Sequence, residues 1–323
     1  MELAFLFPGQ NSRHPSMLQK VLDSDPASGE WLDRASDVLG RDIRTHYRAS
    51  NPSMFSRNRD VQIGVFLANH LHWRLLERAG IRASYSAGLS LGEYNHLVHI
   101  GALEFDDALR VLEARGNAYD DGPRGKMTAV FPASSDDVTD LLNRIGQPAH
   151  LGIGIHNTPR QQVLSGDAAA VDAAAALAEE DLSAHTVVID DRLPMHSPLF
   201  DSVAEALRPA LERASWHRPL LPYLPNVIGR FVSDPGPPDF VDLLSRHVSH
   251  TVRWRESMEV MAETAGSMVV VEAGPGTVLT NLFGRKWLSP RRYATDAAEP
   301  LGAALDSLCE ELTSGRAGAH QPS

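Results

Sequence analysis

Cysteine, basic residues and long apolar runs are scarce in this sequence, and each scarcity excludes a class of protein. Cys309 is the only cysteine in 323 residues, so no disulfide can form within the chain and we expect a reducing compartment. Lysine and arginine total 30 against 41 aspartates and glutamates, and the formal net charge of −11 argues against general nucleic-acid binding. No apolar run approaches the roughly 20 residues of a membrane span. We therefore expect a soluble cytoplasmic protein.

The N-terminal segment, residues 1–8, lacks the basic region that opens a signal peptide, and its apolar stretch ends at Pro8. We interpret residues 3–7 as a core strand that runs into the turn Pro8-Gly9-Gln10-Asn11-Ser12. In open α/β sheets, ligands bind at such turns, just past the carboxyl end of a strand.

The motif around which the chain is organised is Gly88-Leu89-Ser90-Leu91-Gly92, which fits G-x-S-x-G. Residues 83–87 are short and small enough for a strand, and residues 93–98 indicate the first turns of a helix. Strand, tight turn and helix make a nucleophile elbow, where the serine hydroxyl is exposed and the next peptide N–H can face a developing oxyanion. Glycine and serine are also common in loops, so the motif alone does not establish a catalytic serine.

Apolar periodicity predicts the other elements. Helices are expected at residues 60–78, 105–119, 135–145, 168–179, 198–214, 240–247 and 277–283, a loop at 235–238, and strands at 127–131, 151–156, 162–165, 184–189 and 268–272. The order β-α-β-β-α-β within residues 125–194 is that of a ferredoxin-like unit. We predict an α/β fold: a hydrolase-like large subdomain with a parallel sheet (1–124 and 195–312), this small subdomain inserted into it, and a disordered tail at 313–323.

A serine hydroxyl needs a base within hydrogen-bond reach to become a good nucleophile. Among 14 histidines, His196 stands out, because Pro194 and Pro198 bracket it at the point where the predicted insertion returns to the large subdomain. A structural histidine beside a helix N-terminus is an equally good interpretation of this spacing.

Nine short segments occur in an order that resembles malonyl-CoA:acyl carrier protein transacylases and the acyltransferase domains of polyketide synthases. They are Phe7-Pro8-Gly9-Gln10, Gly88-Leu89-Ser90-Leu91-Gly92-Glu93-Tyr94, Gly101-Ala102-Leu103, Arg115-Gly116, Asn157-Thr158-Pro159-Arg160, His196-Ser197-Pro198, Pro225-Asn226-Val227, Val252-Arg253-Trp254 and Glu272-Ala273-Gly274-Pro275-Gly276. The similarity covers about residues 3–285.

The resemblance implies a role for each matching residue. Ser90 corresponds to the nucleophile that takes the acyl group as an ester, and His196 to its general base, which a backbone carbonyl orients in this family. The Leu91 N–H and the region of Gln10 correspond to the oxyanion hole. Arg115 corresponds to the arginine that holds the carboxylate of a malonyl-type chain, a role that suits its planar, always charged guanidinium. Without the family context, Arg115 would be interpreted as a surface arginine.

Asn157 and Asn226 match positions that line or support the site, although ordinary turn asparagines fit equally well. The sequence departs from the family at three places. Leu89 replaces a histidine, His247 replaces a glutamine that helps to fix the catalytic histidine, and Leu193-Pro194-Met195 matches neither of the family's specificity patterns before the histidine. The resemblance implies that Met195 and its neighbours wall the acyl pocket, so an unusual acyl group is possible. The departures therefore concern the substrate and not the chemistry.

The implied substrates are a coenzyme A thioester and the phosphopantetheine of an acyl carrier protein, and no bound cofactor is expected. Four basic residues near the C-terminal end could meet the acidic carrier protein, or form a solvated charged face: Arg285, Lys286, Arg291 and Arg292. The pairs His96/His99 and His247/His250 have metal-ligand spacing but no third ligand, so we expect no metal.

Four other functions fit parts of this pattern. An editing acyl-carrier-protein hydrolase, or a transferase of uncarboxylated groups that may use carrier-protein donors, would keep the fold, but a buried Arg115 without a carboxylate is costly. A catalytically idle carrier-protein-binding module would not need Ser90, His196 and Gln10. A general lipase is disfavoured because no His-Gly-Gly-type oxyanion segment lies upstream.

Overall fold

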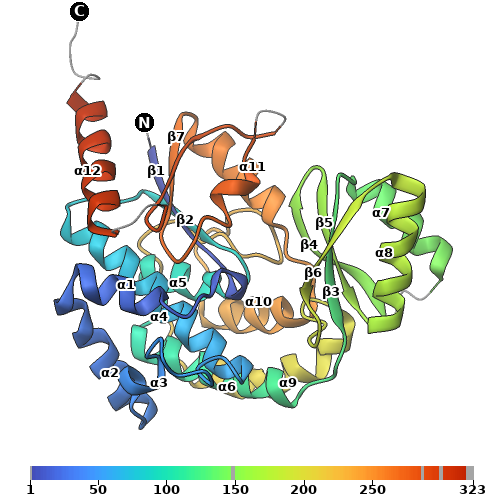
Figure 1. The fold of residues 1–323 in the computed structure, drawn as a ribbon, viewed down its shortest axis with the longest axis horizontal. Coiled ribbons are helices and arrows are strands. Elements are labelled where there is room, and N and C mark those ends of the chain that lie inside the picture. Colours follow the sequence, from blue (N-terminus) through green and yellow to red (C-terminus); the bar gives the residue numbers. More distant parts are fainter. Residues whose placement is uncertain (1, 147–149, 285–286, 298–300, 318–323) are drawn as a thin grey trace, which may run out of the picture.

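Two four-stranded sheets organise the part of the chain that the computed structural model describes, which is residues 2–146, 150–284, 287–297 and 301–317 (Figure 1). The first sheet has the order β2-β1-β7-β8, and its pairs are all parallel. Its strands are β1 (Glu2–Phe7), β2 (Tyr85–Gly88), β7 (Met268–Glu272) and β8 (Arg291–Ala294). Every residue of β7 is buried, as expected of a strand covered on both faces. The predicted α/β fold with a parallel sheet is confirmed.

The second sheet is antiparallel and has the order β4-β5-β3-β6. Its elements are β3 (Lys126–Phe131), α7 (Ser135–Ile145), β4 (Leu151–Thr158), β5 (Gln161–Gly166), α8 (Ala168–Leu182) and β6 (His185–Asp190). The two helices lie side by side on one face of the sheet (Figure 1) and share a separate apolar core with it. Ser134 and Asp137 form the capping box that starts α7. The predicted order of elements in this segment is therefore confirmed.

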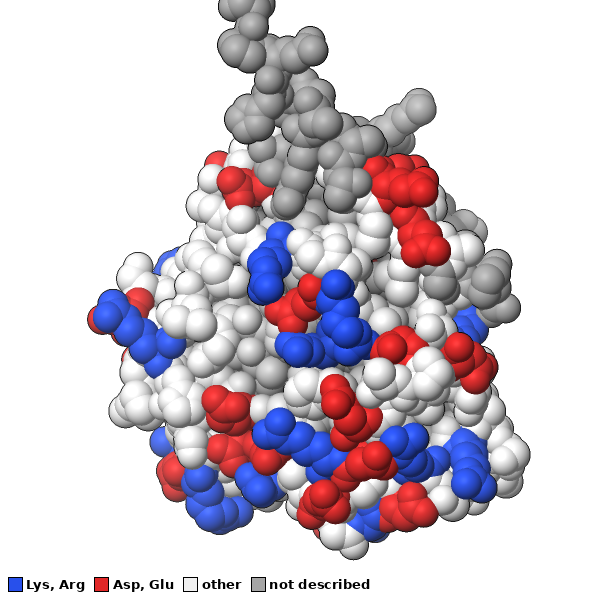
Figure 2. Space-filling view, turned by 90° about the vertical axis from the view of Figure 1, so that its left-hand side faces the viewer, with Lys and Arg blue, Asp and Glu red and all other residues white. Residues whose placement is uncertain are grey.

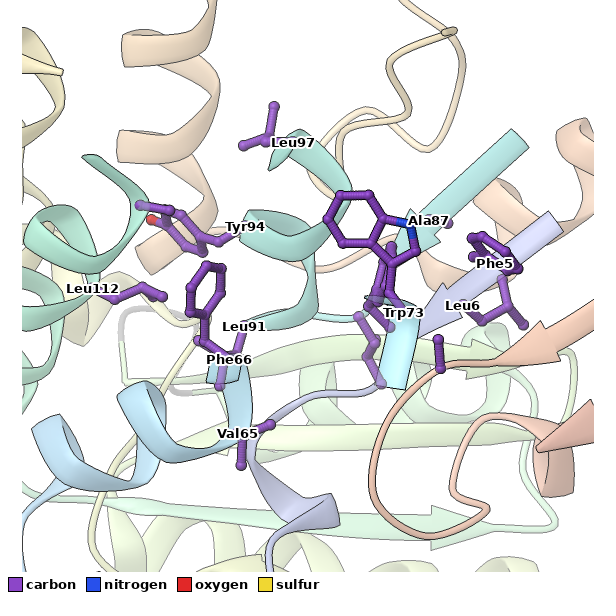
Figure 3. Close-up of a cluster of buried hydrophobic side chains, with 14 of the residues drawn as sticks. Phe5, Leu6, Val65, Phe66, Trp73, Ala87, Leu91, Tyr94, Leu97 and Leu112 are labelled. Atoms are coloured by element: carbon purple, nitrogen blue, oxygen red, sulfur yellow. The ribbon is translucent and has the colours of Figure 1, made fainter. Parts of the chain in front are cut away.

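The helices around the first sheet build the larger core. They are α1 (Met17–Ser24), α2 (Gly29–Leu39), α3 (Ile43–His46), α4 (Asn58–Arg78), α5 (Gly92–His99), α6 (Phe105–Asp121), α9 (Asp201–Arg213), α10 (Pro237–Ser249), α11 (Trp254–Ala265) and α12 (Leu301–Ala317). Figure 3 shows how side chains of β1, α4 and α5 meet in this core, with Phe5, Phe66 and Tyr94 among them. Helix α4 is buried along most of its length, so it fixes the elements that carry the candidate site.

Backbone hydrogen bonds join the antiparallel sheet to the segment between α10 and α11. The His156 N–H donates to Val252 O at 2.9 Å, and the Val252 N–H donates to Gly154 O at 2.8 Å. Val252 follows α10 closely, so β4 is tied to the main chain that leaves this helix. The position of the antiparallel sheet relative to α10 is therefore fixed by main-chain atoms.

Three predictions near the C-terminus and around α10 are wrong. The expected helix at 277–283 is only a 3₁₀ turn, Thr280–Leu282, because the buried carboxylate of Glu272 accepts the N–H groups of Leu279 and Thr280 and holds them as a turn. Pro237 and Pro238 do not form a loop but the first turn of α10, where a missing N–H costs nothing. The tail was expected to be disordered from residue 313, but α12 continues to Ala317. Residues 318–323 lie outside the described residues.

Several elements were not predicted from the sequence: α1, α2, α3, α11, α12 and β8. For α12 a signal was present, because the buried Leu301, Leu305 and Leu308 have helical spacing. None of the described helices is long and apolar enough to cross a lipid bilayer.

Candidate active site

Ser90 lies in the tight turn between β2 and α5, with φ at +51°. A side chain rarely adopts this left-handed conformation, and such strain is concentrated at functional sites. The turn is possible because Gly88 and Gly92 leave room for the main chain: a Cβ on Gly88 would lie 1.9 Å from the carbonyl of Gly92, and one on Gly92 would lie 2.0 Å from Phe7 O. The predicted strand, tight turn and helix, with two glycines at their close approach, are confirmed.

His196 faces this serine. The Ser90 hydroxyl donates to His196 Nε2 at 2.8 Å, and Nδ1 lies 2.7 Å from the main-chain oxygen of His247. Because a carbonyl oxygen only accepts, Nδ1 must carry the proton, which leaves Nε2 free to accept. Burial, with the charge of Arg115 adding to it, lowers the pKa of His196 to about 3, so the imidazole is a neutral base.

The backbone around Ser90 is held by Asn226. The Ser90 N–H donates to Asn226 Oδ1 at 2.8 Å, and Asn226 Nδ2 donates to Gly88 O at 2.7 Å. The turn at Gly9 lies against the same residues, because a Cβ on Gly9 would be 3.8 Å from Ser90 Cβ. In the described part of the chain, the N–H groups of Gln10 and Leu91 donate to no other group, so they are available to an oxyanion.

Arg115 is completely buried and incompletely partnered. Its Nη1 donates to Gln62 Oε1 at 2.7 Å, and its guanidinium lies 4.3 Å from the ring centre of Tyr119 and 5.6 Å from that of Tyr94. Among the described residues, Nε and Nη2 have no hydrogen-bond partner. A buried cation with two free donors is suited to a ligand carboxylate.

A chain of side-chain contacts connects Arg115 with the residue next to His196. Gln62 Nε2 donates to Asn58 Oδ1 at 2.5 Å, Asn58 Nδ2 donates to Gln10 Oε1 at 3.3 Å, and Gln10 Nε2 lies 3.4 Å from Met195 Sδ. Asn58 and Gln62 were not predicted as site residues from the sequence. Their signal was two polar residues at i, i+4 spacing on the buried side of α4.

The other predicted site residues are His247, Leu89, Met195 and Asn157. The ring of His247 stacks on that of His196 with centres 5.0 Å apart, and its Nδ1 is 3.4 Å from Glu93 Oε2. Leu89 is 9% exposed and Met195 4% exposed. Asn157 is buried, and its Oδ1 has no hydrogen-bond partner among the described residues. This oxygen therefore makes no hydrogen bond to Ser90 or His196.

His96 and His99 contact Ser86 and not the Ser90–His196 pair. His96 and His99 both place Nδ1 on Ser86 Oγ, at 2.7 and 2.8 Å, and His96 Nε2 accepts the Leu224 N–H. No cluster of three potential metal ligands occurs among the described residues. Arg291 and Arg292 are exposed on β8, whereas Arg285 and Lys286 lie outside the described residues. On the face drawn in Figure 2, basic and acidic side chains are interspersed.

Comparison with known proteins points to one family. A family model described as "Acyl transferase domain" matches residues 4–295. The malonyl CoA-acyl carrier protein transacylase of Bacillus subtilis (strain 168) is 26% identical over 315 residues, which are 96% of this chain and 98% of that protein. The crystal structure of MCAT from Streptococcus pneumoniae superposes with a TM-score of 0.87 at 29% identity, covering 96% of this chain and 100% of the other. A malonyl-transacylase solved in complex with a type II polyketide synthase acyl carrier protein gives 0.85 at 27%, covering 95% and 100%.

Proposed function

Because the chain belongs to the acyl transferase domain family, we propose that it moves a malonyl-type acyl group from coenzyme A to the phosphopantetheine thiol of an acyl carrier protein, in polyketide or fatty acid biosynthesis. The observation that carries this proposal is the pairing of two features in one buried site. Ser90 and His196 form a nucleophile–base pair, and the nearby Arg115 keeps two unpartnered donors. Similarity to named transacylases over nearly the whole length of this chain supports the same reaction.

In the first half-reaction, Ser90 Oγ attacks the thioester carbonyl while His196 Nε2 takes the hydroxyl proton. The negative charge on the tetrahedral oxygen is placed against the N–H groups of Gln10 and Leu91, each worth about 3–4 kcal/mol in other acyl-transfer enzymes. Collapse breaks the C–S bond, and the coenzyme A thiolate takes the proton from His196. The product is an acyl ester on Ser90.

In the second half-reaction, the phosphopantetheine thiol gives its proton to His196 and its sulfur attacks the ester. Collapse breaks the bond to Ser90 Oγ, which takes the proton back. The acyl group leaves as a thioester of the carrier protein, and the enzyme is regenerated. The main-chain oxygen of His247 keeps the imidazole in one tautomer through both halves.

Arg115 is proposed to select the acyl group. A malonyl carboxylate would supply the acceptors that Nε and Nη2 lack, whereas an acetyl group would leave this cation buried and unpaired. Met195, which contacts Gln10 and precedes His196, is proposed to wall the acyl chain. Leu89, Asn157 and Asn226 are proposed to line or support the same pocket.

The subdomain assignment is also a proposal. Residues 1–124 and 195–312 would form the hydrolase-like large subdomain and residues 125–194 the ferredoxin-like small one, with the site in the cleft between them. The strand order β4-β5-β3-β6 and the separate apolar core of this segment support the assignment. The substrates would be coenzyme A and carrier-protein thioesters, without a resident cofactor, in the cytoplasm.

The test is intact-protein mass spectrometry after brief incubation with malonyl-, methylmalonyl-, ethylmalonyl- and acetyl-CoA, with Ser90→Ala as the control. A malonyl-sized adduct that is absent from Ser90→Ala and is discharged by a holo acyl carrier protein is expected. An adduct from acetyl-CoA alone, or an adduct that only water discharges, would overturn the proposal in favour of an uncarboxylated substrate or an editing hydrolase.

Arg115→Ala sharpens the same experiment. The variant lacks the guanidinium that would bind the malonyl carboxylate. Malonyl loading should therefore slow about 100-fold, and acetyl loading should stay nearly unchanged. Equal effects on the two acyl groups would assign Arg115 a purely structural role.

A further inference from the structure

Glu93 is a buried carboxylate three residues after Ser90, in the first turn of α5, and the reaction described above does not use it. It is 1% exposed. Its Oε1 accepts from the Tyr223 hydroxyl at 2.8 Å, and its Oε2 accepts from the Asn226 N–H at 3.3 Å. The same Oε2 lies 3.4 Å from Nδ1 of His247. One carboxyl group thus contacts three residues from other parts of the chain.

Two of these contacts lead back to the reacting pair by separate routes. On one side, Glu93 holds the main chain of Asn226, whose side chain accepts the Ser90 N–H and donates to Gly88 O. This route fixes the turn that carries the nucleophile.

The other route leads to the base. The ring of His247 lies between Glu93 and His196, because it stacks on the His196 ring while its Nδ1 faces Glu93. The main-chain oxygen of the same residue holds His196 Nδ1. Among the described residues Nδ1 of His247 makes no hydrogen bond, so Glu93 positions this ring by close polar contact at 3.4 Å.

We infer that Glu93 is a positioning residue that holds both members of the Ser90–His196 pair, through Asn226 on the serine side and through His247 on the histidine side. The inference rests on the proposed function, since it assigns the two reacting groups as above. Glu93 does not reach substrate and is not a catalytic residue.

Glu93 acts as a hydrogen-bonding group and not as a charge. Burial raises its pKa to about 8, with the Tyr223 and Asn226 hydrogen bonds and the charge of Arg115 opposing this rise. At neutral pH the side chain is therefore largely a neutral carboxylic acid. Glutamine has nearly the same shape. With its oxygen in the place of Oε2, it accepts the Asn226 N–H and faces His247 Nδ1, and its NH2 group donates to the Tyr223 oxygen. A glutamine at this position should consequently preserve the function.

The test compares Glu93→Ala with Glu93→Gln through two readouts. One is the rate at which a fluorophosphonate probe modifies Ser90, which depends on the Ser90–His196 pair and not on the acyl group. The other is the kcat and KM of transfer from malonyl-CoA. Glu93→Ala should slow both the probe reaction and kcat about 100-fold, because the two groups are no longer aligned, and change KM less than about threefold. Glu93→Gln should restore both rates to within about threefold of the wild type.

Glu272 supplies the matched control. It is also completely buried and accepts main-chain N–H groups, from Leu279 and Thr280, but it contacts neither Asn226 nor His247. Glu272→Ala and Glu272→Gln make the same chemical changes as the two Glu93 variants. Their rates of modification by the probe should stay within about threefold of the wild type when measured below their unfolding temperatures.

Two results would overturn the inference: a Glu93→Ala rate no slower than that of Glu272→Ala, or a Glu93→Gln that is as slow as Glu93→Ala. If Glu93→Ala does not fold, Glu93→Gln and Glu93→Asp decide instead, because Asp is too short to reach both partners and must be the slower of the two. Failure of the proposed function has a different signature. The wild type would then take no malonyl group, while the probe rates of the variants would keep the expected order.

Discussion

The serine side and the histidine side of the site have the same backbone strain but different supports. Ser90 and His196 both have a left-handed φ, at +51° and +61°. The Ser90 N–H is held by a side chain, that of Asn226. His196 is held by main chain at both ends, because its N–H donates to Val248 O at 3.0 Å and its Nδ1 lies on His247 O.

This difference determines which substitutions each side tolerates. Every residue type has a carbonyl oxygen, so the two hydrogen bonds that hold His196 depend on the path of α10, and the side chain of His247 adds only the stacking of its ring. The support of Ser90 depends on an amide at one position, since only such a group can accept the Ser90 N–H and donate to Gly88 O. The serine side should therefore be the more sensitive to substitutions around it.

Removing the base itself should have the largest effect. His196→Ala takes away the only proton acceptor on Ser90 Oγ in the described residues, and Ser90 loading from malonyl-CoA should fall about 10⁴-fold or more. Rapid-quench mass spectrometry measures this rate. A loss below about 10-fold would mean that another group activates the serine.

Asn226→Ala tests the side-chain support. It leaves the Ser90 N–H without its acceptor and frees the turn, so loading should slow about 100-fold and the free energy of unfolding should drop by about 1–3 kcal/mol. Pre-steady-state loading and urea unfolding are the measurements. If this variant loads as fast as the wild type, the serine side is not the more sensitive of the two.

His247→Ala tests the main-chain support and should have a smaller effect than Asn226→Ala. The ring that stacks on His196 is lost, but the carbonyl that holds Nδ1 stays, so loading should slow no more than about 10-fold. His247→Gln should be close to the wild type in the same assay. A loss equal to that of Asn226→Ala would show that the ring matters more than the main chain.

Changes in pH act on the histidine side. With the pKa of His196 held at about 3, the loading rate should show no inflection near pH 6.5 and stay level between pH 8 and pH 5.5. Stability behaves differently: the unfolded chain takes up a proton on His196 near pH 6.5 and the folded chain does not, so the free energy of unfolding falls as pH decreases from 6.5 towards 3. Loading rates and urea titrations across this range test both statements. A loading rate that halves near pH 6.5 would contradict the first.

The backbone strain at Ser90 gives the smallest effect. Both Ser90→Gly and Ser90→Ala are inactive, but glycine accepts the positive φ without strain, so Ser90→Gly should be about 1 kcal/mol more stable than Ser90→Ala. Thermal unfolding measures the difference. The same pair at Ser257, inside α11, should have the opposite order, because glycine weakens a helix.

The sequence predicted the residues that meet more accurately than the contacts that hold them. A motif and two flanking prolines singled out Ser90 and His196, and the family resemblance assigned them as nucleophile and base. Glu93 directly follows the G-x-S-x-G motif and had no predicted role. Its partners Tyr223 and Asn226 are 130 and 133 positions away along the chain. Spacing along a sequence carries no information about contacts of that range.

The remaining errors have a similar cause. The helix expected at 277–283 was overridden by the carboxylate of Glu272, which holds its first residues as a turn. The link between Arg115 and Gln10 was missed because it passes through two polar side chains of α4 that local pattern alone assigns to a helix face. Tertiary hydrogen bonds, and not local propensity, decided both cases.

The bridge between β4 and Val252 has a consequence for how such chains diversify. It is made by main-chain atoms of Gly154, His156 and Val252, so its two hydrogen bonds exclude only proline at the donors His156 and Val252. Packing adds one demand, because a Cβ on Gly154 would lie 2.8 Å from Ser165 Cβ. Recombination that replaces residues 125–194 with the corresponding segment of a relative would retain this attachment. We expect such a replacement to alter the main chain that lies near Met195 and His196, and to leave the supports of Ser90 unchanged.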